Sequence, residues 1–373
     1  MAIVLDPARP PGRRPARRHI PHPAGRNILL TGGSGVVGQA LLANLSGSTT
    51  WCLVHRQPID ASGVVSLLGD IAQPRLGLGT GAFKSLARRI DGIVHSAAIT
   101  NFNLPEELVQ ETNVRGTEHV LELAAAARVP LYHVSTAFVE PTSHSSQAPN
   151  AYERSKRASE QLVRSSGLPH VIVRPSLVVG DSRTGEISQF QGIYQMMGLF
   201  LRGLLPVIPA DAESYADFIP RDVVANAIAS LIERQVVSGE YWLTAGERAL
   251  RLADVASLCT KHAVRLVGRP IEPPRLVSPE VFDRLIAPAF LPALPGRLQR
   301  MLERALQVSR YFNLAERFPS SLPEFERKLG VPQFADLRLV LLRSLDYWAE
   351  ETRFGAAYRD SDVAPLAAGG LGS

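Results

Sequence analysis

Tyr152 and Lys156 stand four residues apart within NAYERSKRASEQLV, residues 150–163. Side chains at this spacing share one face of a helix. A tyrosine, whose ordinary pKa is about 10, exchanges protons poorly at neutral pH, and a nearby ammonium group lowers that pKa by favouring the phenolate. Such a pair can deliver a proton to a carbonyl oxygen while the carbonyl carbon accepts a hydride.

Composition alone does not show whether the Tyr152–Lys156 pair is functional. The chain of 373 residues has 8 tyrosines and four lysines beside 36 arginines. Lysines placed at random would give about 0.1 tyrosine–lysine pairs at this spacing, so chance could supply one. Whether the pair is functional therefore depends on the secondary-structure elements that position it.

A glycine-rich turn lies in RNILLTGGSGVVGQALLANL, residues 26–45. Residues 28–30 predict a short buried strand, and apolar residues from Val36 onward recur at helical spacing. Between them, Gly32 permits a tight turn, Gly35 lets the backbone approach a pyrophosphate, and Gly38 lets the helix pack closely on the strand. The first N–H groups of the helix would face the phosphates. This arrangement predicts a dinucleotide site.

The second predicted strand, WCLV at residues 51–54, is followed by Arg56 rather than by an acidic residue. In NAD-binding units an acid at this strand end binds the adenosine ribose, whereas an arginine accommodates a 2′-phosphate. The nearest downstream acid is Asp60, beyond a proline. We therefore favour NADPH over NADH, against the alternative that Arg56 is a solvated surface residue.

Strand and helix patterns alternate along the chain as far as residue 175. This period predicts an α/β fold with a doubly wound parallel sheet and helices on both faces. The predicted strands after the second are VVSLLGD at 64–70, GIVHSAA at 92–98, PLYHVSTAFV at 130–139 and HVIVRP at 170–175, and the predicted helices are residues 105–127 and 151–167.

We expect the chain to divide into four parts, with the boundary at residue 250 placed where the resemblance described below ends. Residues 1–25 form an Arg/Pro-rich leader that we expect to be disordered, with a transit peptide or a tether to an anionic surface as alternatives. Residues 26–250 are expected to form the dinucleotide-binding domain and residues 251–362 a mainly helical region. Residues 363–373 are expected to be a disordered tail.

Several classes of protein are disfavoured by what the sequence lacks. The sequence contains no run of about 20 apolar residues, so no transmembrane helix is predicted. Cys52 and Cys259 have neither disulfide nor metal-ligand spacing, so we expect no metal site and a reducing, cytoplasmic setting. We expect no nucleic-acid partner. His95, His133 and His144 are separate in the sequence and are interpreted as structural residues.

Taken together, the motifs resemble the extended short-chain dehydrogenase/reductase superfamily. As an ordered set they are specific, which the Tyr–Lys spacing alone is not. The resemblance covers roughly residues 26–250 and implies a Rossmann-type fold and NAD(P)-dependent oxidoreduction. The matching stretches are TGGSGVVG at 31–38, GDI at 69–71, HSAA at 95–98, NVRGT at 113–117, VSTAF at 134–138, YERSK at 152–156 and RPS at 174–176.

The resemblance also implies individual roles. Tyr152 would donate the proton, Lys156 would lower the pKa of Tyr152 and hold the nicotinamide ribose, and Thr136 would hydrogen-bond the substrate oxygen. Asn113 would support the site from the adjacent helix, with a purely structural role as the alternative. The residues implied to contact the cofactor are Thr31, Gly32, Gly35, Val36, Val37, Gly38, Arg56, Asp70, Ser96, Ala97, Ala98, Asn113, Tyr152, Lys156, Pro175 and Ser176.

Three stretches resemble the thioester reductase and fatty acyl-CoA reductase branch of this superfamily. They are GDIAQPRLGL at 69–78, VHSAAITNFNLPEELVQETNVRGTEHVLELA at 94–124, which includes Phe102, and RPSLVVGDSRTGEISQFQG at 174–192. The branch implies NADPH-dependent reduction of an acyl thioester to an aldehyde or, with a second hydride, to an alcohol.

Two other functions stay open. An extended-family ketoreductase or epimerase would act on a ketone, an aldehyde or a nucleotide sugar with the same three residues. A non-catalytic NADP(H) sensor would typically lack the acid–base residues that this sequence retains.

The substrate side is predicted from apolar helices. A helix from about Ser188 to Leu204 could wall an acyl pocket, with an ordinary core helix as the alternative. An amphipathic helix from about Gly296 to Phe312 could be a lid, a dimer surface or a membrane-surface helix, or could bury its apolar face on the main domain. A last helix, residues 337–351, is expected to dock likewise.

Partners are inferred from what surrounds the predicted reductase. No adenylation or carrier segment precedes it, so we expect the acyl thioester to arrive on CoA or on a separate carrier protein. A homodimer stays open.

Overall fold

The computed structural model describes residues 25–354, except 46, 102–103, 141–148, 191, 269, 332–333 and 335. The predicted disordered tail lies outside the described residues, as does all of the leader but its last residue. Phe102 and His144 also lie outside them.

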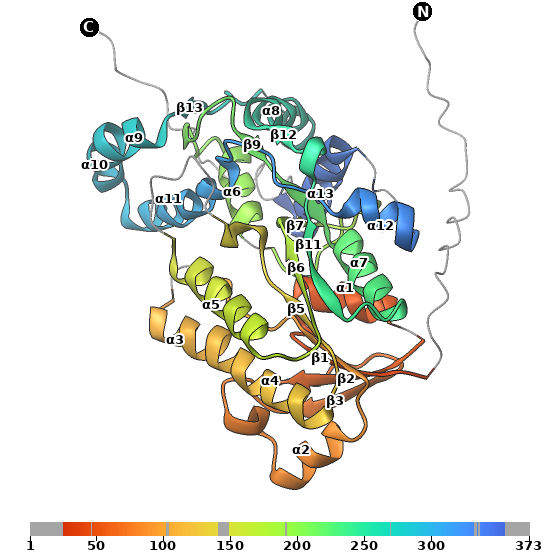
Figure 1. Cartoon of the computed structure of the whole chain (residues 1–373). Coiled ribbons are helices and arrows are strands. Elements are labelled where there is room, and N and C mark those ends of the chain that lie inside the picture. The colour runs from red at the N-terminus through yellow and green to blue at the C-terminus, as the bar shows by residue number, and fades with distance from the viewer. Residues whose placement is uncertain are drawn as a thin grey trace, which may run out of the picture.

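A seven-stranded parallel sheet and the helices that cover it form one half of the molecule, which is called the α/β half below (Figure 1). Its order is β11-β6-β5-β4-β1-β2-β3, which confirms the predicted doubly wound fold. The order reverses between β1 and β4, and ligands of such sheets bind outside the carboxyl ends of the strands at this point. The strands are β1 (Asn27–Thr31), β2 (Thr49–Val54), β3 (Val64–Leu68), β4 (Gly92–His95), β5 (Leu131–Val134), β6 (His170–Pro175) and β11 (Ser238–Leu243).

Helices cover both faces of this sheet because alternate residues of each strand point to opposite sides. In β1, Leu29 packs on one face while Ile28 and Leu30 pack on the other. The helices on the face of Leu29 include α2 (Thr80–Ala87), α4 (Gly116–Ala127) and α5 (Ala151–Ser165), and those on the opposite face include α1 (Val36–Asn44) and α7 (Arg221–Glu233).

Three predicted strands are shorter than expected at their carboxyl ends. They end at Leu68, His95 and Val134, because the residues that follow turn away from the sheet at the edge where the site is expected. The predicted strand 130–139 is wrong beyond Val134: Ala137–Val139 form a 3₁₀ turn instead.

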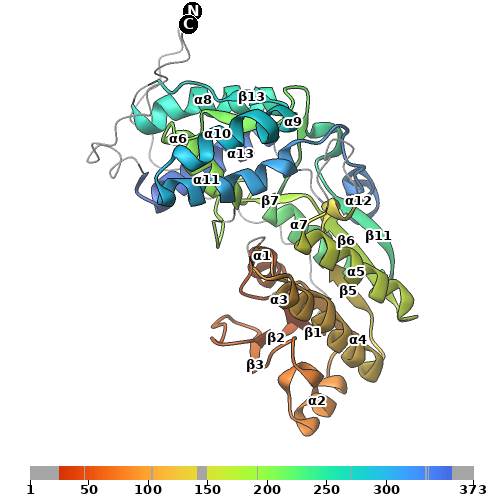
Figure 2. The same ribbon diagram turned by 90° about the vertical axis from the view of Figure 1, so that its left-hand side faces the viewer.

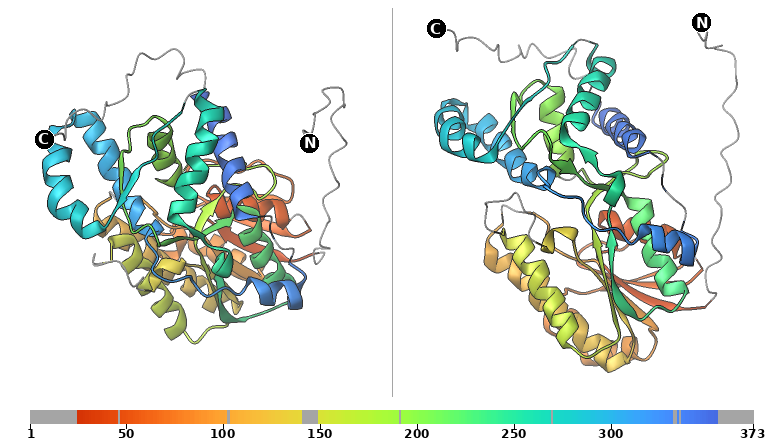
Figure 3. Two further views of the ribbon diagram at one scale, coloured as in Figure 1. Left: turned by 90° about the horizontal axis from the view of Figure 1, so that it is seen from above. Right: turned by 45° about the horizontal axis from the view of Figure 1, so that its top comes forward.

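The rest of the chain adds helices and short strands at the end of the molecule opposite α2 (Figure 2). Among them α12 lies beside α7 (Figure 3). The short strands pair as β7 (Leu177–Val179) with β10 (Phe218–Pro220), β8 (Val207–Pro209) with β13 (Arg275–Val277), and β9 (Tyr215–Ala216) with β12 (Leu250–Arg251). The helices are α6 (Gly192–Leu201), α8 (Leu252–Val267), α9 (Pro279–Val281), α10 (Ala287–Phe290), α11 (Gly296–Ser309), α12 (Leu322–Leu329) and α13 (Leu337–Glu351).

These helices pack on the α/β half rather than standing apart from it. A single hydrophobic cluster runs from Ile28 in β1 to Phe354 after α13. It includes the buried faces of α11 and α13, which confirms the predicted docking of α13 and agrees, for α11, with the alternative that this helix buries its apolar face on the main domain. Helix α6 is shorter than the predicted 188–204, and its side chains are almost all buried in the same cluster.

Within the described residues, no helix is both long enough and apolar enough to cross a membrane.

Candidate active site

The glycine turn between β1 and α1 brings backbone against backbone. Gly32 has a φ of +75°, and a Cβ there would lie 2.6 Å from the amide nitrogen of Ala97, which follows β4. A Cβ at Gly38 would collide with the carbonyl oxygen of Gly32. Helix α1 begins at Val36, and Gly35 before it has no side chain to cap the first N–H groups. These groups can therefore bind the phosphates of a dinucleotide, and Val37 lies in the same first turn.

The ends of β1 and β4 are joined by side-chain hydrogen bonds. The hydroxyl oxygen of Thr31 lies 2.7 Å from Nδ1 of His95 and accepts a 3.3 Å hydrogen bond from the Ala97 amide. The Ser96 amide donates to the Thr31 carbonyl at 3.2 Å. Four predicted cofactor residues, Thr31, Gly32, Ser96 and Ala97, thus meet at the switch point, and Ala98 follows them half-buried.

Arg56 and Asp70 lie at the ends of β2 and β3. Arg56 is exposed and makes no ion pair with a described residue. Its neighbour His55 lies 3.8 Å from the Asp70 carboxylate, which also accepts a 2.9 Å hydrogen bond from the Ala72 amide. The guanidinium of Arg56 is therefore available to an anionic group at this edge.

Asn113 lies in a π-helical segment, Glu111–Arg115, between α3 (Glu106–Gln110) and α4. Its Oδ1 accepts from the Ile99 amide at 2.7 Å, and its Nδ2 donates to the Ile99 carbonyl at 3.0 Å and to the Ser155 hydroxyl at 2.9 Å. Its carbonyl accepts from the hydroxyls of Thr117 and Ser159, at 2.6 and 2.8 Å. Asn113 therefore links the loop after β4 to helix α5.

Helix α5 carries Tyr152 and Lys156 on one face, as the spacing predicted. It starts with a capping box in which Asn150 accepts from the Glu153 amide at 2.9 Å and Glu153 accepts from the Asn150 amide at 3.1 Å. Tyr152 is half-buried and Lys156 is buried. The Lys156 ammonium donates to the carbonyl of Val134, at the end of β5, at 2.6 Å.

Thr136 lies beside Tyr152 at the carboxyl end of the sheet. The two hydroxyls hydrogen-bond each other. The Thr136 hydroxyl also lies 3.5 Å from the carbonyl of Pro175, and the Ser176 amide donates to the Leu243 carbonyl at 3.2 Å. The structure thus brings Thr136, Tyr152 and Lys156 together near the cofactor turn.

Burial sets the proton affinities at this site. It raises the pKa of Tyr152 to about 12, against the opposing effect of the hydrogen bond to Thr136. It lowers the pKa of Lys156 to about 8, against the opposing charge of Glu160. In this arrangement burial dominates the Tyr152 pKa and the Lys156 ammonium is bonded to Val134, so the lowering of that pKa by Lys156 stays a prediction.

His95 and His133, which are separate in the sequence, are neighbours in space. They are paired across β4 and β5, with ring centroids 5.4 Å apart, and both are fully buried. Burial and then the charge of Lys156 lower the pKa of His95 to about 3 and that of His133 well below its usual value. Nε2 of His95 lies 3.1 Å from the hydroxyl of Thr117, whereas His133 hydrogen-bonds no described residue. Two neutral imidazoles therefore lie beside Lys156.

The C-terminal region contributes contacts that the sequence did not reveal. The side-chain Nδ2 of Asn150 donates to the Tyr311 hydroxyl at 2.8 Å, and Arg310 pairs with Glu153 at 3.3 Å. Both contacts hold the first turn of α5, where Tyr152 lies. No local spacing could have identified Tyr311, because it lies 161 residues from Asn150.

Metal and thiol chemistry have no candidate residues in the part of the chain that the structure describes. No three His, Cys, Asp or Glu side chains gather there in a way that could hold a metal ion. Cys52 and Cys259 are buried free thiols, and burial raises the pKa of both. Cys52 belongs to the hydrophobic core.

Comparison with known proteins shows which proteins the chain resembles. Residues 54–228 match a family model described as male sterility protein. The chain is 29% identical over 246 residues to one of the linear gramicidin synthase proteins of Brevibacillus parabrevis, a match that covers 54% of this chain and 5% of that protein. It is 27% identical over 309 residues to the isonitrile lipopeptide synthase of Streptomyces coeruleorubidus, covering 72% of this chain and 20% of that protein.

A solved structure extends the likeness over most of the chain. The terminal R domain of the myxalamid PKS-NRPS biosynthetic pathway superposes with a TM-score of 0.72 at 26% identity, covering 88% of this chain and 92% of that one. The chain thus spans a small part of the curated relatives and nearly all of that R domain. The motifs, the fold and these likenesses agree with the extended short-chain dehydrogenase/reductase superfamily and its thioester reductase branch, as the sequence predicted, and support an oxidoreductase with a nicotinamide cofactor.

Proposed function

We propose that this protein reduces an acyl thioester, carried by CoA or by a separate carrier protein, to an aldehyde or an alcohol with NADPH. The observation that supports this most is the meeting of Thr136, Tyr152 and Lys156 at the carboxyl edge of the sheet, beside the Gly32 turn, in a chain that resembles the thioester reductase branch.

The cofactor site is supported by the shape of the turn. Side chains at Gly32 and Gly38 would collide with the backbone of Ala97 and of Gly32 itself, so this tight turn needs glycine at both positions. Arg56 would bind the 2′-phosphate of NADPH, because it is exposed at the end of β2 without a carboxylate partner among the described residues. A bound reduced nicotinamide would supply the hydride.

The proposed roles of the three side chains follow from their proton affinities. The Tyr152 hydroxyl is protonated at neutral pH, as a proton donor must be, but its pKa of about 12 makes it a weak acid, so the proposal requires the Lys156 charge to lower that pKa when the site is occupied. Thr136, bonded to the same hydroxyl, would hydrogen-bond the substrate oxygen as it gains charge. Lys156, with a pKa of about 8, is mainly cationic at neutral pH and would stabilise that charge and hold the nicotinamide ribose.

The proposed reaction balances without a protein nucleophile. Hydride adds to the thioester carbon, and the Tyr152 proton passes to the oxygen, which gives a hemithioacetal. The carbon–sulfur bond then breaks, the hydroxyl proton is lost, the sulfur leaves as a thiol, and an aldehyde remains. A second hydride and proton would convert that aldehyde to the alcohol.

Product analysis tests this proposal. The purified protein is incubated with NADPH or NADH and a panel of acyl-CoA and acyl-carrier thioesters, and aldehyde, alcohol and free thiol are measured by mass spectrometry. Ketones, aldehydes and nucleotide sugars form the comparison panel. We expect aldehyde or alcohol from at least one thioester. Turnover of ketones or sugars with neither product from any thioester would overturn the proposal.

A further inference from the structure

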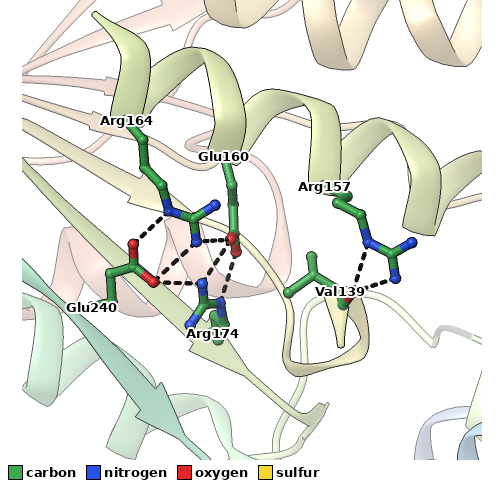
Figure 4. A network of polar contacts seen from close by, with 6 residues as sticks. All are labelled: Val139, Arg157, Glu160, Arg164, Arg174 and Glu240. Atoms are coloured by element: carbon green, nitrogen blue, oxygen red, sulfur yellow. Dashed lines mark hydrogen bonds and ion pairs between the residues drawn. The ribbon is translucent and has the colours of Figure 1, made fainter. Parts of the chain in front are cut away.

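An ion-pair network, buried at Glu160 and Arg174 and partly exposed at Arg164 and Glu240, lies one helical turn beyond Lys156 on α5. Glu160 is 2% exposed and receives two hydrogen bonds from Arg174 of β6, at 2.9 and 2.7 Å. Arg164 donates to the same carboxylate at 2.7 Å. Arg174 and Arg164 each also form an ion pair with Glu240 on β11, with N···O distances of 2.6 Å (Figure 4).

This network ties α5 to the sheet at the level of the catalytic residues. Arg174 also lies over the ring of Trp242, 5.0 Å from its centroid, on the strand that carries Glu240. Breaking a buried pair by removing one partner leaves a charge without compensation, so the network resists rotation or sliding of the helix. Figure 4 also shows Arg157 of α5 reaching the carbonyl of Val139, beyond the Thr136 turn.

Glu160 is placed to act on Lys156 as well as to hold the helix. The two side chains are four residues apart on the buried face of α5, so they are neighbours along one turn. The other titratable groups facing Lys156 are His95 of β4 and His133 of β5, which burial keeps neutral, and Tyr152 of its own helix. Glu160 is thus the carboxylate whose charge opposes the effect of burial on Lys156.

We propose that Glu160 is a positioning residue for the Tyr152–Lys156 pair: its carboxylate, held by Arg174 and Arg164, keeps the buried Lys156 cationic and fixes α5 on β6. Only the expected effect of Glu160 on catalysis rests on the proposed function. The charge state of Lys156 can be measured without any substrate.

The sign of the effect follows from the charges. Removing the carboxylate leaves burial unopposed, so the pKa of Lys156 falls and the ammonium is lost at a lower pH. If catalysis needs the cation, activity declines as the pH rises through the Lys156 pKa. That decline should therefore begin at lower pH without Glu160.

Because the chain has four lysines, protein labelled with ¹³C at lysine Cε should give a spectrum simple enough to titrate. The Lys156 signal is assigned by its loss in Lys156→Arg. We expect it to titrate near pH 8 in the unmodified protein and about one pH unit lower, or more, in Glu160→Gln. Glu160→Asp, which keeps the charge, should bring the midpoint back toward the unmodified value.

Glu240→Gln is the matched control. It makes the same chemical change and removes a bond to the same Arg174, but Glu240 lies on β11 rather than one turn from Lys156. Both glutamine variants should lose stability, whereas only Glu160→Gln should move the Lys156 midpoint. An unchanged midpoint in Glu160→Gln, or an equal shift in Glu240→Gln, would overturn the inference.

Two further measurements test the role of Glu160 if the first variant fails to fold or if a substrate is found. If Glu160→Gln does not fold, the double variant Glu160→Met with Arg174→Met removes both buried charges, and a lowered Lys156 midpoint is again required. Where a thioester is turned over, the alkaline decline of the rate should move with the midpoint. Absence of thioester turnover by the unmodified protein would count against the proposed function and leave the titration result standing.

Discussion

At the scale of single residues, the site combines a hydroxyl that keeps its proton with an ammonium that can lose one. Burial moves the pKa of Tyr152 up to about 12 and that of Lys156 down to about 8, so both changes disfavour the charged form. Between neutral pH and pH 8 the pair is a neutral phenol beside a cation. This state suits proton donation to an oxygen that is gaining negative charge.

Replacing Tyr152 by Phe removes the proposed proton donor and leaves the turn around Gly32 intact. We expect turnover to fall by about 10²- to 10⁴-fold, because this is the usual contribution of a positioned acid or base. NADPH binding, followed by the fluorescence of the bound cofactor, should change little. A variant that keeps its rate would exclude Tyr152 as the donor, and a protein whose output never depended on turnover would be a sensor.

Replacing Arg56 by Gln should affect the two cofactors differently. A hydrogen-bonded charge pair contributes about 1.5–3 kcal/mol, so loss of the contact to a 2′-phosphate should raise the KM for NADPH about tenfold or more. The KM for NADH should stay nearly constant, since that cofactor lacks the phosphate. Steady-state rates with both cofactors provide the check. An equal change for both would mean that Arg56 does not read the 2′-phosphate.

At the scale of elements, α5 is held at both ends. Its first turn is bound by its own capping box and by Arg310 and Tyr311 of the C-terminal region. Its later turns are bound to β6 and β11 through Glu160 and Arg164. Tyr152, the second residue of the helix, therefore depends on contacts from segments that are distant in sequence.

The capping residue offers a direct test of this dependence. Asn150→Ala removes the acceptor for the Glu153 amide and the donor to Tyr311, and such a loss should cost about 1 kcal/mol of unfolding free energy. Turnover should fall beyond what that loss explains, because the first turn carries Tyr152. Denaturant unfolding and initial rates measure the two effects.

Asp336→Ala is the control for the cap variant. Asp336 caps α13 by accepting from the Arg338 amide at 2.9 Å, in a helix that carries no proposed catalytic residue. It should lose comparable stability and keep its rate. Equal losses of rate in the two variants would indicate a general effect of destabilisation.

At the scale of the whole molecule, sequence reasoning reached the local features and missed the distant ones. The Gly32 turn, the Tyr152–Lys156 face and the last helix each leave a local pattern, of glycine spacing or of helical period, and each was found. The pairing of His95 with His133 and the contact of Tyr311 with Asn150 depend on how separate elements meet, which no local period records. Glu160 could have been predicted from the sequence, since it follows Lys156 by the same four residues that separate Lys156 from Tyr152.

The shared core implies that the α/β half and the C-terminal helices unfold together. Residue 250 was expected to end the dinucleotide-binding domain, yet one cluster joins Leu30 of β1 to Leu345 of α13. Two packed regions with a common core lose their stabilising contacts at once, so they behave as one cooperative unit. We therefore expect the boundary at residue 250 to separate functions rather than folding units.

The three tryptophans allow this to be tested, because Trp51 lies in β2 and Trp348 in α13. Variants that keep only one of them, made by Trp→Phe exchange, should show the same denaturant midpoint by fluorescence. Leu345→Ala, a fully buried truncation in α13, should cost about 2–5 kcal/mol and lower both midpoints equally. If the Trp348 signal moved alone while the Trp51 signal kept its midpoint, the C-terminal helices would be a separate folding unit. Their contacts to the first turn of α5 could then open without unfolding of the sheet.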